Sequence, residues 1–538
     1  MIVPPMLKAR GVIISVAAAT CLLSGCRGRH AVTTYHYDNF RSGWNSNEKE
    51  LTPAKVASPA FGLLHSVVLD DQVDAQPLVV PNVKISGGGD PGKHEVVYLA
   101  TENNTIYAIN AANGAILLSR NLGPPIPSPL GCNNNGPNVG VDGTPVIDRE
   151  DKTMYVIVYS AEAGTPVYRI HALDLRTLND KVAPVKVAAS HVLKDGSTFN
   201  FDARYQRQRP GLLLAHGNVY AGFGSFCDFR ADVSRGWILG WKAGSLAPLP
   251  ANTVNDRLAT SPDNFFLSSV WMSGYGLAAD ESGHIYFITG NSDSNASTTT
   301  YDGVFDVQES VVKLSDDLSK ILDVFTPSNV QDLDRADNDY GSGGVLLLPD
   351  QAGPLPHLTA AAGKDGRMFI LNRDGLGGFT SGGPDKAVAV VDIGGCWCGQ
   401  SYFLDHTDGL LRIVSSGGTK VNLWRIQPSP SVAITKDGAS TNLNSGQDPG
   451  FFTSISSDGK KGKDAIIWAV SRPTNASPAN VSLYAFNGEP TGGSLTQLFQ
   501  GTAGNWPNVG GNANIVPVVA NGKVFVASNQ QLAIFGLH

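Results

Sequence analysis

Short apolar runs alternate with polar turns along nearly the whole chain. Residues 97–118, VYLATENNTIYAINAANGAILL, contain three apolar runs that are separated by ENN and NAANG. The runs are rich in Val, Ile, Leu and Tyr and end at Gly, Asn, Asp or Pro, a pattern that is typical of β-strands joined by turns. The pattern therefore predicts a sheet of short, sequential strands.

The same arrangement of strands and turns recurs eight times. The first copy reads AQPLVVPNV, EVVYLATENN and TIYAINAANGAILLSRN, and the second reads GTPVIDRE, TMYVIVYS and YRIHALDLRTL. Copies are about 45 to 70 residues apart with four strands each, which is the size of a β-propeller blade. A pair of β-sandwiches or a β-helix is the alternative, but neither restates a unit of this length so regularly.

The last copy, NIVPVVANG, KVFVASNQ and QLAIFGL, has only three strands. Residues 61–70, FGLLHSVVLD, form a strand without a blade and can supply the fourth strand. This pairing would close the ring and leave no free sheet edge. We therefore predict an all-β, eight-bladed propeller of four-stranded antiparallel blades, closed by residues 61–70 and the C-terminal blade.

The N-terminus reads as a secretion signal. Lys8 and Arg10 precede an apolar run at residues 11–23, which is too short for a permanent membrane span. The run ends in LSGC, with Cys26 last, and this sequence resembles the lipobox of bacterial lipoproteins. The resemblance implies cleavage before Cys26 and attachment of acyl chains that hold the protein on a membrane. An ordinary signal peptide with an incidental cysteine is the alternative.

These signals divide the chain into three parts. We expect a lipoprotein signal peptide at 1–25, a polar lipidated tether and lead-in at 26–60, and the propeller at 61–538. Arg27, rather than Asp, follows the cysteine, which favours the outer membrane, with the propeller facing the periplasm or the cell surface. The formal charge is −7 and no basic cluster is present, so nucleic acid is not an expected partner.

Familiar catalytic motifs are missing: the chain has no HExxH, GxSxG, P-loop or CxxC sequence. In a propeller, loops from every blade converge at the mouth of the central channel. We therefore expect any chemistry to lie there, on residues that are far apart in sequence.

The units VYLATENNTIYAIN and GTPVID resemble the quinoprotein-like propeller family over essentially the whole mature chain. That family contains dehydrogenases that use pyrroloquinoline quinone with a calcium ion. It also contains non-enzymatic members, such as the propeller lipoprotein of the outer-membrane barrel-assembly machinery. The resemblance specifies the fold more closely than the activity.

The resemblance implies roles for several residues. In YFITGN it implies Asn291 as a calcium ligand, and in ADNDYGSGG it implies Asp337, with Asp339 beside it, as catalytic base and calcium ligand. In AAGKDG it implies Lys364 as the cation that contacts the quinone oxygens, and in GGCW it places Trp397 beside the cofactor. Carboxylate and amide oxygens suit calcium, a cation suits an oxygen that gains negative charge, and an ionised Asp suits proton removal from an alcohol.

The chain also departs from the enzymatic pattern. The enzymes have a disulfide between adjacent cysteines, whereas Asn133 follows Cys132 here. The calcium-binding Glu is replaced by a loop in which Asp228 is the nearby carboxylate, and Trp271 is offset from the expected position. No CxxCH haem site is present. The implied cofactor set is Cys132, Trp271, Lys364, Trp397 and Trp506, and the implied metal set is Asp228, Asn291 and Asp337.

Each of these residues also has a structural explanation. Asn291 is common in turns, Asp337 lies in an acidic loop that is typical of a solvated surface or a structural calcium site, and Lys364 suits a hairpin turn. Trp397 suits packing between blades. The order of the motifs along the chain is that of the family, which common descent without activity would also preserve.

Four cysteines remain after the N-terminal region: Cys132, Cys227, Cys396 and Cys398. An exported protein meets an oxidising setting, but pairing cannot be deduced from spacing. The family resemblance places Cys132 and Cys227 in loops around the central site, so we predict a disulfide between them. The alternative joins either one to Cys396 or Cys398. Cys396 and Cys398 suit a structural disulfide or two thiols better than a metal or redox pair.

Three functions stay open at this stage. The first is a lipid-anchored dehydrogenase of alcohols or sugars that uses pyrroloquinoline quinone and calcium. The second is a non-catalytic scaffold that binds protein or glycan on its loop face, like the barrel-assembly relative. The third is a carbohydrate or polymer binder.

Overall fold

The computed structural model describes residues 29–538 except 133, 135, 252, 256, 258–266, 293–305, 444–449, 472–478 and 508–513. The predicted signal peptide and Cys26 lie outside the described residues. Within the described part of the chain, no helix is long and apolar enough to cross a membrane.

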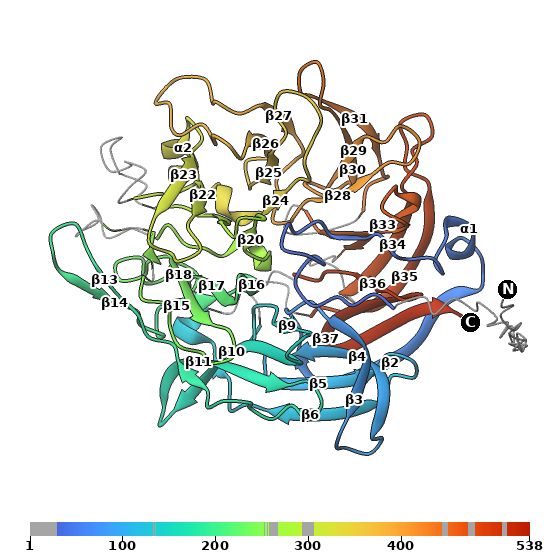
Figure 1. Ribbon diagram of the computed structural model, residues 1–538, viewed down its shortest axis with the longest axis horizontal. Helices are drawn as coiled ribbons and strands as arrows, with labels where there is room; N and C mark the ends of the chain where they lie inside the picture. Colours follow the sequence, from blue (N-terminus) through green and yellow to red (C-terminus); the bar gives the residue numbers. More distant parts are fainter. Residues whose placement is uncertain are drawn as a thin grey trace, which may run out of the picture.

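Eight sheets follow one another around a ring, which confirms the predicted eight-bladed propeller (Figure 1). Blade 1 consists of β3 (Leu78–Ile85), β4 (Gly92–Ala100), β5 (Thr105–Asn110) and β6 (Ile116–Asn121). Blade 2 consists of β9 (Val146–Asp148), β10 (Thr153–Glu162), β11 (Thr165–Asp174) and β12 (Val185–Lys186). Blade 3 has a divided inner strand and consists of β15 (Gln206–Gln208), β16 (Leu213–Ala215), β17 (Asn218–Ser225), β18 (Trp237–Lys242) and β19 (Thr253–Val254).

The second half of the ring repeats this order. Blade 4 consists of β20 (Ala278–Ala279), β21 (Ile285–Ile288), β22 (Val311–Leu314) and β23 (Ile321–Phe325). Blade 5 consists of β24 (Val345–Leu347), β25 (Leu358–Ala362), β26 (Arg367–Asn372) and β27 (Ala389–Asp392). Blade 6 consists of β28 (Ser401–Leu404), β29 (Leu411–Ser415), β30 (Asn422–Gln427) and β31 (Ala433–Ala439). Blade 7 consists of β32 (Phe452–Asp458), β33 (Lys463–Ser471), β34 (Asn480–Asn487) and β35 (Gln497–Asn505).

Blade 8 combines the two ends of the chain. It contains β36 (Val518–Ala520), β37 (Lys523–Leu537) and β2 (Phe61–Gln72). A straight strand of 15 residues would be about 50 Å long. However, a Cβ atom built on Gly536 would lie only 3.1 Å from the carbonyl oxygen of Gly522, so β37 folds back on itself. Gln530, with φ +54°, marks the turn and gives the blade its fourth strand.

Residues 61–72 pair antiparallel with the second half of β37, from Phe61 opposite Leu537 to Gln72 opposite Asn529. The N-terminal strand thus lies beside the C-terminal hairpin in one sheet. This arrangement is compatible with the ring closure that we predicted for residues 61–70.

The remaining elements are short. The strands are β1 (Trp44–Asn45), β7 (Ile126–Pro127), β8 (Asn138–Val139), β13 (Ser190–Val192) and β14 (Thr198–Asn200). The helices are α1 (Pro53–Val56) and α2 (Val330–Ala336), with single 3-10 turns η1 (Pro129–Gly131), η3 (Met272–Gly274) and η4 (Tyr340–Ser342).

The core lies between neighbouring blades, because both faces of each sheet are covered. Successive side chains of a strand point to opposite faces. In β4, Val96 and Tyr98 belong to the same buried cluster as Val156 of blade 2. Val97 and Leu99 of the same strand belong to a different cluster that includes the strands of blade 8. The sequence of a blade strand is therefore a continuous run of apolar residues, without alternation between apolar and polar positions.

Residues 32–47, which we call the central segment, run through the middle of the ring (Figure 1). The segment has hydrogen bonds to the inner part of every blade. In blade order, its partners are Val79, Ile147, Leu212, Leu277, Leu347, Tyr402, Ile455 and Val519.

The segment is irregular, as we expected for the lead-in, but it lies inside the propeller rather than outside it as a tether. Its polar groups bond to the inner edges of eight blades that surround it. The sequence of the segment therefore lacks the regular spacing of apolar residues that a helix or a strand would have. Arg41 is fully buried and donates from Nε to the Leu277 carbonyl at 2.7 Å and from Nη2 to the Leu212 carbonyl at 3.3 Å.

Candidate functional site

The strands of a blade alternate in direction. The turn between the second and third strands and the connection to the next blade therefore leave from the same end of every blade. We call this end the loop face. The catalytic, cofactor, metal and disulfide residues that we predicted from sequence lie in loops of these two kinds, for example Asn291 between β21 and β22 and Asp337 between β23 and β24.

A cavity of about 180 Å³ opens on the loop face among the loops of blades 3 to 6 and the connection between blades 1 and 2. Its lining consists of Asn134, Arg209, Ser225, Cys227, Asp228, Trp271, Asp337, Asp339, Lys364 and Trp397. Six predicted residues therefore share one cavity, although they are as far apart in sequence as Cys227 and Trp397. Arg209, Asn134 and Ser225 were not predicted, because no motif marks them.

Lys364 is the centre of the cavity's charge network. Its backbone N–H donates to the Asp339 carbonyl at 3.0 Å, which fixes the turn between β25 and β26 against the preceding connection. Its Nζ lies 2.6 Å from Asp339 Oδ2 and 3.3 Å from Asp337 Oδ2. Burial alone would lower the pKa of Lys364, but the two carboxylates raise it. The ammonium group therefore stays charged.

The two carboxylates differ in environment. The Asp339 side chain is only 4% exposed, whereas that of Asp337 is 70% exposed. Partial desolvation by the surrounding loops, followed by repulsion from Asp339, raises the pKa of Asp337 although most of its side chain is exposed. The family motif implies the main role for Asp337, but Asp339 is the more deeply buried partner of Lys364.

Asn291 joins the network through both its backbone and its side chain. Its N–H donates to Asp339 Oδ1 at 2.9 Å, and its Nδ2 donates to Asp337 Oδ1 at 3.2 Å. A Cβ atom on the preceding residue, Gly290, would lie 3.0 Å from Trp271 Nε1 and 3.2 Å from Asp339 Oδ1. Glycine at this position therefore permits the close approach.

Asp228 faces the same cavity from blade 3. Burial raises its pKa to about 6, with further contributions from Asp339 and Asp337, although its hydrogen bond to the Ser225 hydroxyl opposes the shift. A carboxyl group in this range changes its protonation close to neutral pH and can accept or return a proton there.

Two tryptophans and two cations, Lys364 and Arg209, form much of the rest of the wall. Trp271 and Trp397 meet edge to face, with ring centres 5.9 Å apart. Lys364 Nζ lies 5.5 Å and 5.1 Å from the centres of these two rings, and the Arg209 guanidinium lies 5.2 Å from that of Trp271. Arg207 lies behind this wall and bonds Asn134 Oδ1.

Cys132 and Cys227 form a disulfide with a Cα–Cα distance of 5.6 Å, which is the pairing that we expected. It ties the connection before blade 2 to a turn of blade 3 at the cavity wall. Cys396 and Cys398 form a second disulfide on either side of Trp397. The Cys396 N–H donates to the Gly363 carbonyl at 3.0 Å, so this short bridge is fixed to the turn that carries Lys364.

One expectation needs correction. Trp506 does not line the cavity: it is fully buried in an apolar cluster between blades 7 and 8 that also contains Trp468. The calcium role of Asp228, Asn291 and Asp337 stays a prediction: Asn291 Nδ2 lies 3.2 Å from Asp337 Oδ1, and Asp228 lines the same cavity as Asp337. Within the described ranges, the one group of three acidic, His or Cys side chains at metal-ligand spacing lies elsewhere.

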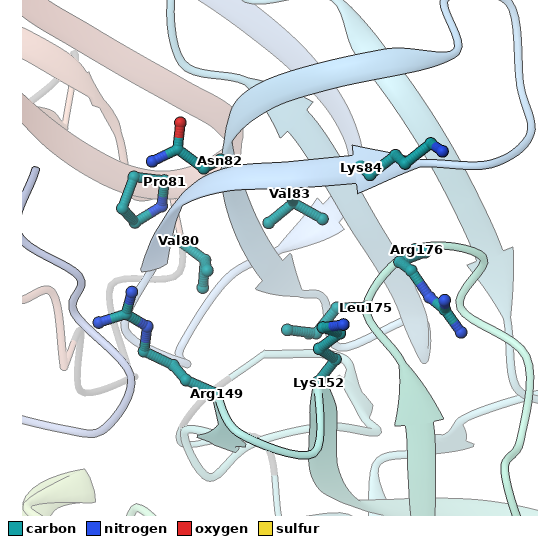
Figure 2. Close-up of a pocket in the computed structure, with 9 residues that line it drawn as sticks. All are labelled: Val80, Pro81, Asn82, Val83, Lys84, Arg149, Lys152, Leu175 and Arg176. Atoms are coloured by element: carbon teal, nitrogen blue, oxygen red, sulfur yellow. The ribbon is translucent and has the colours of Figure 1, made fainter.

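A second cavity, of about 360 Å³, lies at the opposite end of blades 1 and 2 (Figure 2). Its polar lining is basic and includes Lys84, Arg149, Lys152 and Arg176. None of the predicted site residues lines it, so the smaller cavity on the loop face is the candidate functional site.

No protein-family model matches the chain, and no curated protein matches it either. Solved structures do. The quinohemoprotein alcohol dehydrogenase from Comamonas testosteroni has a TM-score of 0.61 at 13% identity, over 94% of this chain and 80% of that chain. A quinohemoprotein alcohol dehydrogenase from Pseudomonas putida has a TM-score of 0.59 at 13% identity, with the same shares covered.

A europium-containing methanol dehydrogenase has a TM-score of 0.57 at 12% identity, over 94% of this chain and 98% of that chain. At such low identity these similarities establish a shared architecture, and activity has to be argued from the site. The chain therefore has the eight-bladed propeller fold of the quinoprotein alcohol dehydrogenases.

Proposed function

We propose that the cavity on the loop face binds a small hydroxyl-rich ligand, such as a polyol or one sugar ring at the end of a glycan. The observation that carries this proposal is the set of groups around one cavity of about 180 Å³: carboxylates, an ammonium, a guanidinium and two indoles.

The chemistry of the lining suits such a ligand. Carboxylates accept hydrogen bonds from hydroxyl groups, while Lys364 and Arg209 donate to them, and charged partners make the stronger hydrogen bonds. Trp271 and Trp397 add apolar surface for the carbon skeleton of a sugar. The volume is below the roughly 300–1,000 Å³ of pockets for drug-sized ligands, which favours a ligand of one ring.

Binding can be tested by calorimetry with a panel of monosaccharides, polyols and oligosaccharides. We expect Lys364→Met to weaken binding of the best ligand at least about tenfold, because a charged hydrogen-bond donor is lost. Lys436→Met is the matched control, since Lys436 Nζ also lies over an indole, 5.7 Å from the Trp424 ring centre, but outside the cavity. Equal affinities for the two variants, or no binding by the wild type, would contradict the proposal.

Quinone-dependent oxidation of an alcohol or sugar is the second candidate function. It is favoured because Trp271, Asp337, Lys364 and Trp397, each implied by a separate family motif, share one cavity. In that reading Lys364 and Arg209 would hold the anionic oxygens of pyrroloquinoline quinone, and the Cys132–Cys227 disulfide and the indoles would flank its rings.

The residues present do not fit that cofactor as the loops lie here. The cavity is too small for a three-ring quinone together with a substrate. The Lys364 ammonium also lies 3.3 Å from Asp337 Oδ2, so this predicted calcium donor is paired with a cation of the protein. We therefore expect no retained quinone absorbance after the protein is incubated with quinone and calcium and then desalted. Retained absorbance together with reduction of an artificial electron acceptor by an alcohol would instead establish the dehydrogenase.

We further propose that the protein is exported and anchored through lipid on Cys26, facing the periplasm or the cell surface. The support is the N-terminal sequence alone: a basic start, an apolar run at 11–23 and the LSGC sequence. In that position the loop face would be available to a glycan or a protein partner.

A further inference from the structure

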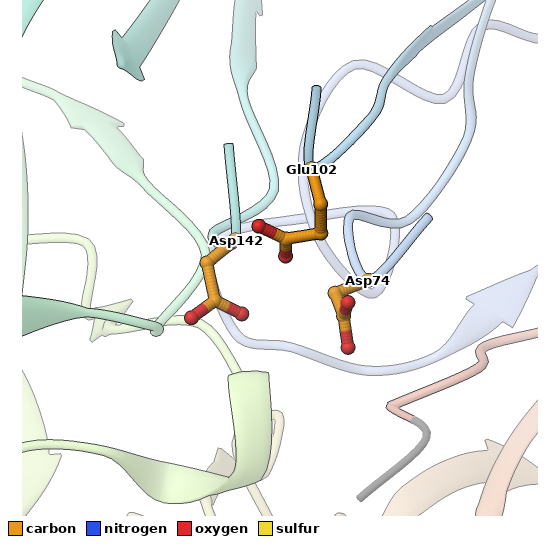
Figure 3. A group of neighbouring side chains, drawn as sticks. All are labelled: Asp74, Glu102 and Asp142. Atoms are coloured by element: carbon orange, nitrogen blue, oxygen red, sulfur yellow. The ribbon is translucent and has the colours of Figure 1, made fainter. Parts of the chain in front are cut away.

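Three buried carboxylates meet below the loop face, between blades 1 and 2 (Figure 3). Asp74 precedes β3, Glu102 lies in the turn between β4 and β5, and Asp142 lies between β8 and β9. Their side-chain oxygens come within 4.8 Å of one another, and the residues are 5%, 1% and 4% exposed. None of the three lines the cavity described above.

Each carboxylate is held in place by a protein donor at one of its two oxygens. The donors are Gln72 Nε2 for Asp74 Oδ2, the Gly140 N–H for Glu102 Oε2, and Arg207 Nε for Asp142 Oδ2, each at 2.6 Å.

The second carboxylate oxygens of Glu102 and Asp142 are not held by a donor in this way. Glu102 Oε1 and Asp142 Oδ1 are buried and have no hydrogen-bond partner among the described residues. Figure 3 shows the carboxylates turned toward one another. A buried, unpartnered carboxylate oxygen is costly, so this arrangement needs a positively charged group or a proton between the side chains.

The charges indicate which group fits. Three ionised carboxylates and the Arg207 guanidinium leave a net charge of about −2 in a buried volume. A single proton would remove only half of the excess charge, whereas a divalent cation matches it.

We propose that Asp74, Glu102 and Asp142 bind a hard divalent cation, calcium or magnesium. Carboxylate oxygens are the ligands that these ions prefer, and two oxygens on opposite sides of a calcium ion are about 4.6–5.2 Å apart. Oxygens within 4.8 Å of one another can therefore reach one ion. The fixed second oxygens act as the outer hydrogen bonds that orient metal ligands.

The site goes beyond the proposed function because it lies apart from the ligand cavity. It is nevertheless connected to the cavity wall: Arg207 holds Asp142 with Nε, and its Nη1 donates to Asn134 Oδ1, which lines the cavity. The bound cation would thus fix the connection that carries Cys132 and Asn134.

The test is equilibrium dialysis of chelator-treated wild-type protein against Ca²⁺, and separately against Mg²⁺, with metal analysis. We expect one equivalent that is bound at least about tenfold more weakly in Glu102→Gln. Asp337→Asn is the matched control, since it removes a carboxylate of the cavity, and it should keep this equivalent. Loss in Asp337→Asn with retention in Glu102→Gln would overturn the proposal, as would a wild type that binds neither ion.

Thermal unfolding gives a second measurement. Calcium or magnesium should raise the Tm of the wild type, and the increase should be absent in Asp74→Asn as well as in Glu102→Gln. If both variants fail to fold, Asp337→Asn still decides. A metal-dependent rise in Tm that persists in Asp337→Asn supports the site, and a rise that is lost in Asp337→Asn or absent from the wild type contradicts it. Failure of sugar binding would leave these outcomes unchanged.

Discussion

Replacing Arg41 by methionine tests whether the central segment stabilises the ring. The Arg41 side chain is fully buried and donates hydrogen bonds to the carbonyls of Leu277, Leu212 and Tyr35 and to the Thr34 hydroxyl. Burial lowers its pKa only to about 10, so the guanidinium stays charged at neutral pH. The two leucines belong to neighbouring blades, and one side chain therefore connects both to the segment.

The expected loss follows from these contacts. Methionine fills much of the same space but leaves buried carbonyls of blades 3 and 4 without their donor. Breaking a buried charged network of this kind costs about 3–5 kcal/mol. A propeller of roughly 500 residues has an unfolding entropy of about 1 kcal/mol/K, from ~2.1 cal/mol/K per residue. The substitution should therefore lower the Tm by about 3–5 °C.

Differential scanning calorimetry provides the assay, and Arg204→Met provides the control. Arg204 pairs with Asp202 only two residues away, and its side chain is 57% exposed. Surface substitutions of this kind change stability by less than about 0.5 kcal/mol, so the control should shift the Tm by under about 1 °C. If Arg41→Met shifts the Tm by no more than the control does, the central segment does not stabilise the ring in the way described.

Further outcomes follow from other parts of the structure. The folded state raises the pKa of Asp228 to about 6. The raised pKa stabilises the folded protein fully below about pH 4, where the carboxyl is protonated in both states, and this contribution is lost as the pH rises through about 6. The Tm of Asp228→Asn should therefore increase relative to that of the wild type between pH 4 and pH 7. The Cys132→Ser, Cys227→Ser double variant opens a bridge of sequence separation 95, for which chain entropy gives about 4–5 kcal/mol, and its Tm should fall by about 4 °C. Deleting residues 514–538 removes β36 and β37 and should abolish cooperative unfolding in calorimetry. Cys26→Ala should move the protein from the membrane fraction to the soluble fraction.

A specific outcome would contradict each of these four predictions. A Tm difference between Asp228→Asn and wild type that does not change with pH would show that this carboxyl does not titrate in the expected range. An unchanged Tm without the disulfide, a sharp transition without residues 514–538, or a membrane-bound Cys26→Ala variant would contradict the respective prediction.

The fold could be predicted because a propeller repeats one local pattern. Each blade restates the same apolar runs and turns, so eight weak signals support one another. The central segment could not be predicted in the same way. Its polar residues, such as Thr34 and Arg41, suggest a solvated tether when read alone, and their partners on eight different blades are known only once the ring is formed.

Part of the candidate site could likewise be predicted from the sequence, and part of it could not. Sequence motifs pointed to Trp271, Lys364 and Trp397, and the three residues line one cavity. Asp337 and Asp339 are two residues apart, and no local pattern shows which one is buried. The carboxylates at Asp74, Glu102 and Asp142 come from three separate loops, so their proximity depends on how blades 1 and 2 pack.

The central segment has a consequence for how the chain reaches its final form. Tyr37 Oη accepts a hydrogen bond from the Val519 N–H, although 482 positions separate the two residues. The part of the chain that leaves the ribosome first therefore cannot complete its contacts until the part made last has folded. Contacts of such long sequence separation make folding slow. We expect the central segment to bind first to blades that form early, such as the blade of Val79, and then to each later blade in turn. The C-terminal hairpin of β37 would complete its contacts.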